Sequence, residues 1–396
     1  MRFQGHRTGE PLPKYRWRVA IRLTPTELTD QERALQAEVR AFCDEFLPRG
    51  SFEPGLGMSS GPSKELSREL GKRGWLGMAL PTRYGGSDRS TVDRLVVVEE
   101  LLRRGAPLEQ HWTADRQSGI VINRFGTEEQ KQRFLPDIAA GELCFCIGMS
   151  EPDSGSDLAS VKTRATPTDG GWLLNGTKIW TSNAHFADWM ICLCRTADAD
   201  TPHQGLSQLL VDMHADGISI NPIPLLDGTA DFSEVVFNDV FVADDLLLGE
   251  PGNGWQQVTS ELSFERAGPE RWITPIIIVE NFLREYADHL SEAALDFLGH
   301  TIARWWGLRQ ISLAAARMID EGKAPALQAA MGKDMGTEFE QEVIAELQQL
   351  VDIEPSLTSD SQFSRLLARA VLVAPSWAIR GGTNEILKGI IAKGLR

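Results

Sequence analysis

The 396-residue chain has few cysteines, fewer basic than acidic residues, and no long apolar run. Five cysteines are an odd and sparse set, which argues against a disulfide framework and predicts a reducing, cytoplasmic environment. The 40 Lys and Arg against 55 Asp and Glu give a net charge of -15, which argues against nucleic acid as the main partner. No apolar run reaches the roughly 18 residues of a membrane span, and residues 1–22 lack the apolar segment of a secretory signal. We therefore expect no membrane insertion.

The amino-acid composition is typical of a globular protein, and the chain is long enough to form two or three packed units. Residues 1–25 predict an irregular arm. Helical spacing of Leu35, Val39, Phe42 and Phe46 predicts a helical domain over 26–140. Short Val-, Ile- and Cys-rich runs separated by turn residues then predict an antiparallel β domain over 141–250, and helical periodicity returns over 251–396. The expected strands are 143–149, 172–178, 189–195, 207–212, 218–223 and 234–242.

The segment from Gly148 to Asp157 follows an expected strand and is rich in Gly, Ser and Asp. Such a loop presents hydroxyls and backbone amides, which suit a polar, planar or phosphate-bearing ligand. The alternative is an ordinary surface loop, and composition does not separate the two.

A second segment, residues 175–183, leads from a turn into a strand with Trp180 two residues before Ser182. Alternate residues of a strand share a face, so an aromatic ring and a hydroxyl lie together there. This pair is a reasonable seat for an isoalloxazine ring. The alternative is that Trp180 belongs to the core.

A third segment near the C-terminus pairs Gly381 and Gly382 before Thr383. It predicts a tight turn that opens a final helix over 384–393. Free amides at a helix start suit a phosphate or a carbonyl oxygen. The alternative is an ordinary capped helix.

Taken together and in this order, the three segments resemble the acyl-CoA dehydrogenase family of flavoproteins. The resemblance runs from about Asp30 to the end and includes the segments 81–86, 125–130, 134–136, 141–142 and 249–255. It implies an α+β, mainly α fold: an N-terminal helical domain, a central antiparallel β domain and a C-terminal four-helix bundle. It also implies FAD between the β domain and the bundle, with the acyl thioester on the other side of the flavin.

The resemblance assigns roles to residues of all three segments. It implies that Met149, Ser150, Ser156, Trp180 and Ser182 contact the flavin or line the entrance to its site, with Ser182 near flavin N5. Thr383 and Glu385 match family positions that contact the cofactor. Gly381 and Gly382 match family positions that contact the substrate.

The reaction of the family needs a base to remove the proton beside the thioester carbonyl. Many members carry a Glu where this chain has Gly381, so no base is expected there. Other members carry a Glu-Arg pair at the start of a bundle helix, which matches Glu265 and Arg266. We expect Glu265 to be the base and Arg266 to shape the substrate site, with Glu261 and Glu270 as weaker candidates. The alternative is that Glu265 and Arg266 form a solvated surface pair.

Two family elements are missing. The Arg-x-x-Phe-Gly element is replaced by residues 287–292, and the glycine-rich element is absent around 348–355. These losses put the pyrophosphate and adenine contacts of the cofactor in doubt. They are compatible with mixed α2β2 assemblies in which some subunits keep only part of a flavin site.

Other residues invite different interpretations. Two Cys-x-Cys pairs, Cys144/Cys146 and Cys192/Cys194, could suggest zinc, but they lie in apolar strand runs and favour core packing. His111 is expected to line a pocket or the core. Trp305 and Trp306 are expected in the bundle core. The glycines form no dinucleotide fingerprint, so no nicotinamide site is expected.

The resemblance implies FAD-dependent conversion of an acyl-CoA to the trans-2-enoyl-CoA, with electrons passed to an electron-transferring flavoprotein. A branched or bulky acyl group is our preferred substrate, in a homotetramer, a dimer or an α2β2 heterotetramer. One alternative is a flavin-dependent monooxygenase on the same scaffold, which needs no carboxylate base. Another is a partner subunit whose flavin site serves assembly.

Overall fold

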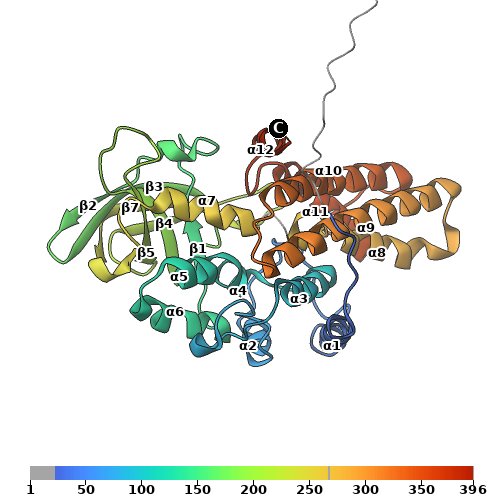
Figure 1. The fold of residues 1–396 in the computed structure, drawn as a ribbon. Helices are drawn as coiled ribbons and strands as arrows, with labels where there is room; N and C mark the ends of the chain where they lie inside the picture. The colour runs from blue at the N-terminus through green and yellow to red at the C-terminus, as the bar shows by residue number, and fades with distance from the viewer. Residues whose placement is uncertain (1–22, 266–267, 396) are drawn as a thin grey trace, which may run out of the picture.

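The computed structural model describes residues 23–265 and 268–395. Helices, a β-sheet and further helices follow one another along the chain, as the sequence predicts. In Figure 1 the sheet lies at one end of the molecule, the long C-terminal helices lie at the other, and the N-terminal helices run along one side of both. The C-terminal helix α12 (Asn384–Gly394) packs against α10 (Ala326–Leu350) of the bundle.

The N-terminal domain is helical because its apolar residues recur on single faces and several of its helices begin at a side-chain cap. Leu35, Val39 and Phe42 are buried on one face of the first helix, as their spacing predicts. Thr127 and Gln130 form a capping box at the start of another helix. The helices are α1 (Asp30–Phe46), α2 (Lys64–Lys72), α3 (Thr91–Arg104), α4 (Glu109–Thr113), α5 (Gly119–Phe125) and α6 (Glu128–Ala140), with a π-turn, η2 (Ala114–Ser118), between α4 and α5.

The β domain is one sheet in the order β6-β7-β3-β2-β4-β5-β8, with β1 added beside β4. It is antiparallel except where β1 and one residue of β2 pair with β4 in parallel. The expected strands are present, and β2 is an additional strand that pairs with β3. The strands are β1 (Phe145–Gly148), β2 (Arg164–Thr168), β3 (Gly171–Ser182), β4 (Trp189–Arg195), β5 (Leu206–Asp212), β6 (Ile218–Ile223), β7 (Phe232–Ala243) and β8 (Leu247–Leu248).

The four strand cysteines lie in the core of this sheet. Cys144, Cys146, Cys192 and Cys194 are all buried among apolar residues. Burial raises the pKa of Cys144 to about 12 and that of Cys192 to about 11, so both thiols stay protonated at neutral pH. Their core-packing interpretation is confirmed.

The C-terminal unit begins with α7 (Gly254–Glu265) and continues into the bundle helices α8 (Ile276–Tyr286), α9 (Glu292–Asp320), α10 and α11 (Gln362–Trp377). Its core is continuous with that of α1 and α3, so the N-terminal helices and the bundle share one apolar cluster. The core prediction holds for Trp305, which packs partly buried on this cluster, but is wrong for Trp306, which is 55% exposed. Adjacent helix residues point in different directions, so only one of the two reaches the core.

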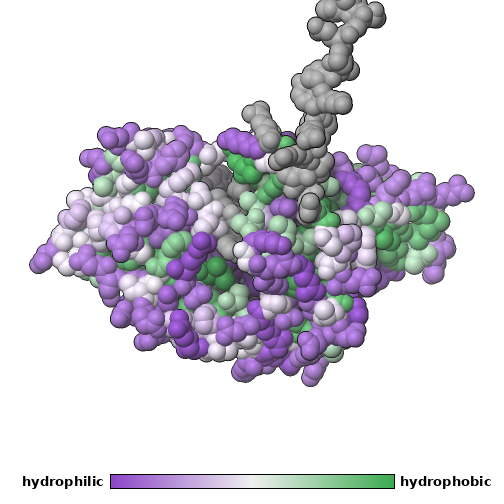
Figure 2. Space-filling view, in the orientation of Figure 1, coloured by the Kyte–Doolittle hydropathy of each residue, from purple (hydrophilic) through white to green (hydrophobic). Residues whose placement is uncertain are grey.

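One face of α9 carries large apolar side chains that the described part of the chain does not cover. Leu295, Ile302 and Trp306 are each 55% exposed. In Figure 2 apolar residues also gather over the bundle, whereas most of the rest of the molecular surface in this view is hydrophilic. Within the described ranges, no helix is long and apolar enough to cross a bilayer.

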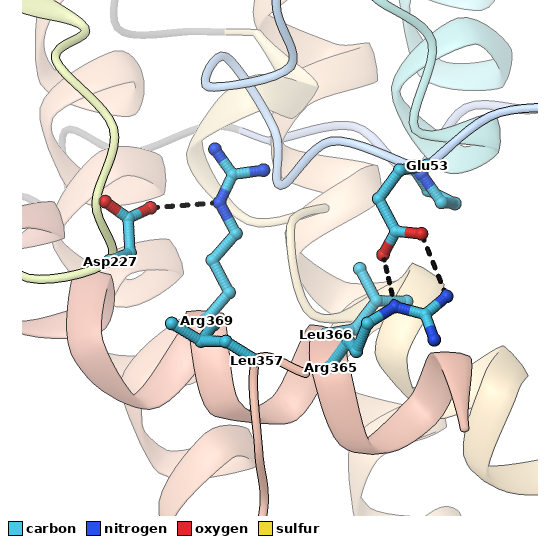
Figure 3. Close-up of a pocket in the computed structure, with 7 residues that line it drawn as sticks. Glu53, Asp227, Leu357, Arg365, Leu366 and Arg369 are labelled. Carbon is cyan, nitrogen blue, oxygen red and sulfur yellow. Dashed lines mark hydrogen bonds and ion pairs between the residues drawn. The ribbon is translucent and has the colours of Figure 1, made fainter. Parts of the chain in front are cut away.

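Ion pairs join all three units at a cavity of about 390 Å³. Arg369 of α11 donates to Asp227 of the β6–β7 loop at 3.0 Å, and Arg365 of α11 donates to Glu53 of the N-terminal domain at 2.9 Å (Figure 3). The Asp227 carboxylate is almost fully buried and also accepts from Thr229. Helix α11 is thus joined to the β6–β7 loop through Arg369 and to the N-terminal domain through Arg365.

A buried histidine predicts a pH dependence of stability. His111 of α4 lies 2.7 Å from the Ser67 hydroxyl, and burial lowers its pKa to about 4. The folded state therefore disfavours the charged imidazole, so stability is complete above the unfolded value near 6.5 and falls as the pH drops toward 4. From linkage we expect a loss of roughly 2 kcal/mol at pH 5. Urea denaturation at pH 7.5 and pH 5 should show this loss for wild type and a smaller one for His111→Gln. The exposed His300 supplies the control: His300→Gln should keep the wild-type pH dependence.

Candidate functional site

The loop after β1 is fastened to β3. The Ile179 amide donates to the Ser150 carbonyl at 2.9 Å, and the backbones of Glu151 and Ser154 exchange two hydrogen bonds. Met149 and Ser150 are half-buried, whereas Ser156 is exposed. A loop held this closely to a strand can present its amides and hydroxyls in a defined direction, which a plain surface loop does not.

Trp180 and Ser182 share the open face of β3. Trp180 is 54% exposed and Ser182 is exposed, whereas Thr181 between them is buried. The two residues therefore lie on one side of the strand, as predicted, and the alternative that Trp180 is core is wrong. The indole meets Phe232 edge to face at 6.2 Å, and Phe232 is also the β7 residue paired with Ser182. The result is an aromatic platform with a hydroxyl beside it.

The backbone at this platform is strained. Trp180 has φ +58° and Asn183 has φ +63°, and the β3–β7 register shifts between Lys178 and Thr181. A bulky residue in the left-handed region costs about 1–3 kcal/mol. Such strain persists at sites where side-chain placement matters, so Trp180 is a candidate for ligand contact rather than for packing.

The glycine pair near the C-terminus forms the predicted turn. Gly381 has φ +64° and Gly382 has φ +92°, and residues other than glycine rarely adopt such positive φ values. Thr383 caps α12 by accepting from the Ile386 amide, and Glu385 is exposed in the first turn. The Lys333 ammonium of α10 donates to the Gly382 carbonyl at 2.6 Å, which fixes the turn on the bundle.

Helix α7 runs from the β domain, where it contacts β5, toward the bundle (Figure 1). Near its start, Trp255 and Val258 pack with Met149 and Leu158 of the loop after β1. Farther along, the helix contacts α10, and it ends at Glu265. The predicted base therefore occupies the bundle end of α7. The side chains of residues 261–265, and all of Arg266, lie outside the described residues.

The chain just after α7 meets the glycine turn. The Arg380 guanidinium donates to the Glu270 carbonyl at 3.4 Å and to the Glu340 carboxylate at 2.8 Å. Glu340 of α10 also accepts from the Thr274 amide at 3.3 Å. A Cβ at Gly336 would lie 2.4 Å from the Arg271 carbonyl, so α10 can approach this segment only because Gly336 has no side chain. The segment 270–274 after α7 and the turn at 381–383 are thus held against one stretch of α10.

Glu270, a weaker candidate for the base, has a structural partner. Its side chain is 3% exposed and lies 3.2 Å from the Arg116 Nε of η2. This buried ion pair links the N-terminal domain to the segment after α7. Sequence reasoning did not find Glu340, Arg380 or Arg116 as parts of the site. The available signal was charge at positions that lie within otherwise buried helical faces.

Models of three protein domains match consecutive parts of this chain. They are "Acyl-CoA dehydrogenase, N-terminal domain" over residues 29–142, "Acyl-CoA dehydrogenase, middle domain" over 146–240, and "Acyl-CoA dehydrogenase, C-terminal domain" over 252–396. Together they cover most of the chain, and their borders fall where the structure passes from helices to sheet and back.

Individual proteins support the same likeness. Acyl-CoA dehydrogenase IpdE1 of Mycobacterium tuberculosis is 34% identical over 372 residues, covering 90% of this chain and 95% of its own length. The solved structure described as "Tcur3481-Tcur3483 steroid ACAD" superposes with a TM-score of 0.81 at 28% identity, over 93% of this chain and 97% of the other. A glutaryl-CoA dehydrogenase of Mycobacterium smegmatis, solved in complex with FADH2, gives 0.77 at 25% identity, over 93% and 95%.

Proposed function

The chain belongs to the acyl-CoA dehydrogenase family, and from this we propose that it uses FAD to oxidise an acyl-CoA thioester to the trans-2-enoyl thioester. The structural observation that carries the proposal is the strained, exposed Trp180 platform on β3 with the Ser182 hydroxyl beside it. Such a platform suits a planar cofactor. The glycine turn fixed on the bundle is the proposed substrate side.

The residues of the platform fit FAD. The exposed Trp180 ring offers a surface for stacking, and the Ser182 hydroxyl on the same face can hydrogen-bond to a ring edge. Met149, Ser150 and Ser156 on the adjoining loop, and Thr383 and Glu385 at the start of α12, would complete the seat. When bound, FAD would accept the hydride that leaves the β-carbon of the acyl chain.

Glu265 is the residue proposed to remove the proton from the carbon next to the thioester carbonyl. Gly381 and Gly382 carry no side chain that could take it, and Glu270 is engaged by Arg116. A carboxylate at the bundle end of α7, enclosed by an apolar acyl group, would have its pKa raised toward neutrality, as a general base requires. Arg266 follows it directly and would line the substrate site.

A branched or bulky acyl group is the substrate class we favour. The two glycines at 381 and 382 leave the turn without side chains, which provides room beside the thioester. The similar structure described as a steroid acyl-CoA dehydrogenase points the same way. An electron-transferring flavoprotein would then reoxidise the flavin.

The Trp180 platform gives a direct test of the cofactor seat. Trp180→Ala removes the stacking surface, and we expect the dissociation constant of FAD to rise by roughly 10- to 100-fold, as the loss of about 1.4–2.8 kcal/mol implies. Titration of the apoprotein with FAD, followed by protein fluorescence, measures it. Trp306→Ala is the matched control because that indole is equally exposed but lies on α9 of the bundle. Equal losses in both variants would remove Trp180 from the seat.

The proposed activity is tested by anaerobic titration of the purified protein with a panel of acyl-CoA thioesters. A substrate should bleach the visible absorbance of bound flavin, with bulky acyl groups bleaching most completely. A yellow protein that no thioester bleaches, but that consumes oxygen with a separate flavin reductase, would instead be a monooxygenase.

A partner subunit of a mixed assembly is the second candidate function. It is favoured by the replacement of the Arg-x-x-Phe-Gly element at residues 287–292 and by the open apolar face formed by Leu295, Ile302 and Trp306 on the neighbouring α9. A colourless chain that acquires flavin only when it is co-expressed with a homologous subunit would establish this role. Light scattering would distinguish a dimer, a homotetramer and an α2β2 assembly.

A further inference from the structure

A fully buried lysine lies directly beneath the cofactor-side loop. The Lys178 side chain is 0% exposed, although it comes from β3 only two residues before Trp180. Its ammonium donates to the Glu151 carboxylate at 2.8 Å and to the Met149 carbonyl at 3.0 Å. Lysine is rarely buried completely, and it is buried here with its charge matched and two hydrogen bonds donated.

The Glu151 carboxylate is bound on several sides. One oxygen accepts from the Lys178 ammonium and from the Thr163 amide at 2.9 Å, and the other accepts from the Lys162 amide at 2.6 Å. These donors outweigh burial and lower the pKa of Glu151, so the carboxylate is charged at neutral pH. The side chain therefore ties the beginning of the loop to its end, eleven and twelve residues later.

Gly148 leaves the space that the aliphatic part of the Lys178 side chain occupies. A Cβ at this position would lie 3.1 Å from Lys178 Cγ and 2.6 Å from Met190 Sδ. Any larger residue would press on the stem or on the methionine of β4. Gly148, Glu151 and Lys178 thus form one arrangement, drawn from two segments that the sequence separates.

We propose that Lys178 and Glu151 are positioning residues that set the distance between the Ser150 loop and the Trp180 platform, and thereby the affinity and spectrum of FAD; this rests on the proposed function. The Ile179 amide donates to the Ser150 carbonyl, so the pair lies immediately beside a backbone hydrogen bond that joins these two walls. Stability does not explain the pair, because buried ion pairs are often replaceable by apolar residues without loss. Fixed placement of Ser150 against Trp180 does explain it.

The test compares this pair with a buried pair elsewhere. Arg309 of α9 and Glu99 of α3 lie 2.6 Å apart and are similarly buried, but they join the bundle to the N-terminal helices. Lys178→Met and Lys178→Met/Glu151→Gln are compared with Arg309→Met and Arg309→Met/Glu99→Gln. For each folded variant, the dissociation constant of FAD, the visible absorbance of the bound flavin and the melting temperature are measured.

We expect both Lys178 variants to bind FAD at least about tenfold more weakly and with a shifted absorbance maximum, while the Arg309 variants lose only thermal stability. The double variant at 178 and 151 should regain melting temperature, since no unpaired carboxylate remains, without regaining affinity. The inference is overturned if the double variant binds FAD within twofold of wild type with an unchanged spectrum. It is also overturned if the Arg309 variants lose the same affinity. A wild-type chain that takes up no FAD would instead overturn the proposed function on which the inference rests.

Discussion

Replacement of Glu265 by Gln should leave FAD bound but slow flavin bleaching by acyl-CoA by about 10²–10⁴-fold, the usual contribution of a general base. The amide keeps the size of the side chain and removes its ability to take the proton beside the thioester carbonyl. Cofactor affinity should be unchanged because the residues proposed to hold FAD lie on β3, on the loop after β1 and at the start of α12. Stopped-flow absorbance after anaerobic mixing of the oxidised variant or the oxidised wild type with acyl-CoA measures the effect.

Two matched variants show whether the effect belongs to Glu265. Glu261→Gln makes the same chemical change one turn earlier in α7 and should bleach at the wild-type rate. Glu270→Gln weakens the buried contact to Arg116 and should lower stability more than bleaching. Normal bleaching by the Glu265 variant, with loss in either of the others, would move the base to that residue.

Removal of Arg380 should strongly destabilise the bundle. Arg380→Met removes the guanidinium that donates to the fully buried Glu340 carboxylate, and breaking a buried pair in this way costs about 3–5 kcal/mol. Burial already raises the pKa of Glu340, which means that the folded state favours the neutral acid. The loss should therefore be largest at high pH and shrink as the pH falls and Glu340 takes up a proton. Urea denaturation at several pH values measures both effects.

The compensating variant separates charge from packing. Arg380→Met/Glu340→Gln leaves no buried charge, so it should recover much of the stability that Arg380→Met loses. Arg284→Met breaks an exposed contact to Glu280 on α8 and should change the unfolding free energy by less than about 1 kcal/mol. A loss in Arg380→Met as small as that in Arg284→Met would show that Glu340 has another partner.

Several parts of this molecule follow directly from local sequence. Thr127 and Gln130 form a capping box because their side chains reach amides only three residues away. The glycines at 381 and 382 adopt positive φ because that turn requires it, and Thr383 caps the next helix. Alternation in β3 correctly placed Trp180 and Ser182 on one side of the strand.

Other features depend on contacts that local sequence does not reveal. The positive φ of Trp180 coincides with a register shift of β3 against β7, and the paired strand lies more than fifty residues later in the chain. Only one of the adjacent residues Trp305 and Trp306 reaches the core, because the rotation of α9 is decided by its neighbours. Periodicity alone gives the faces of an element but not which face is covered.

The sequence by itself determined the order of the three units, because this depends on residue type and on spacings of a few positions. The segments proposed for the site, and the absence of a base at Gly381, came from the resemblance to the family. The tertiary structure decided which charges are buried together. Lys178 with Glu151, Arg380 with Glu340 and Arg116 with Glu270 each join elements far apart in the chain. A charged residue looks solvated in sequence, and only the fold that removes water from it and supplies its partner makes it part of the site.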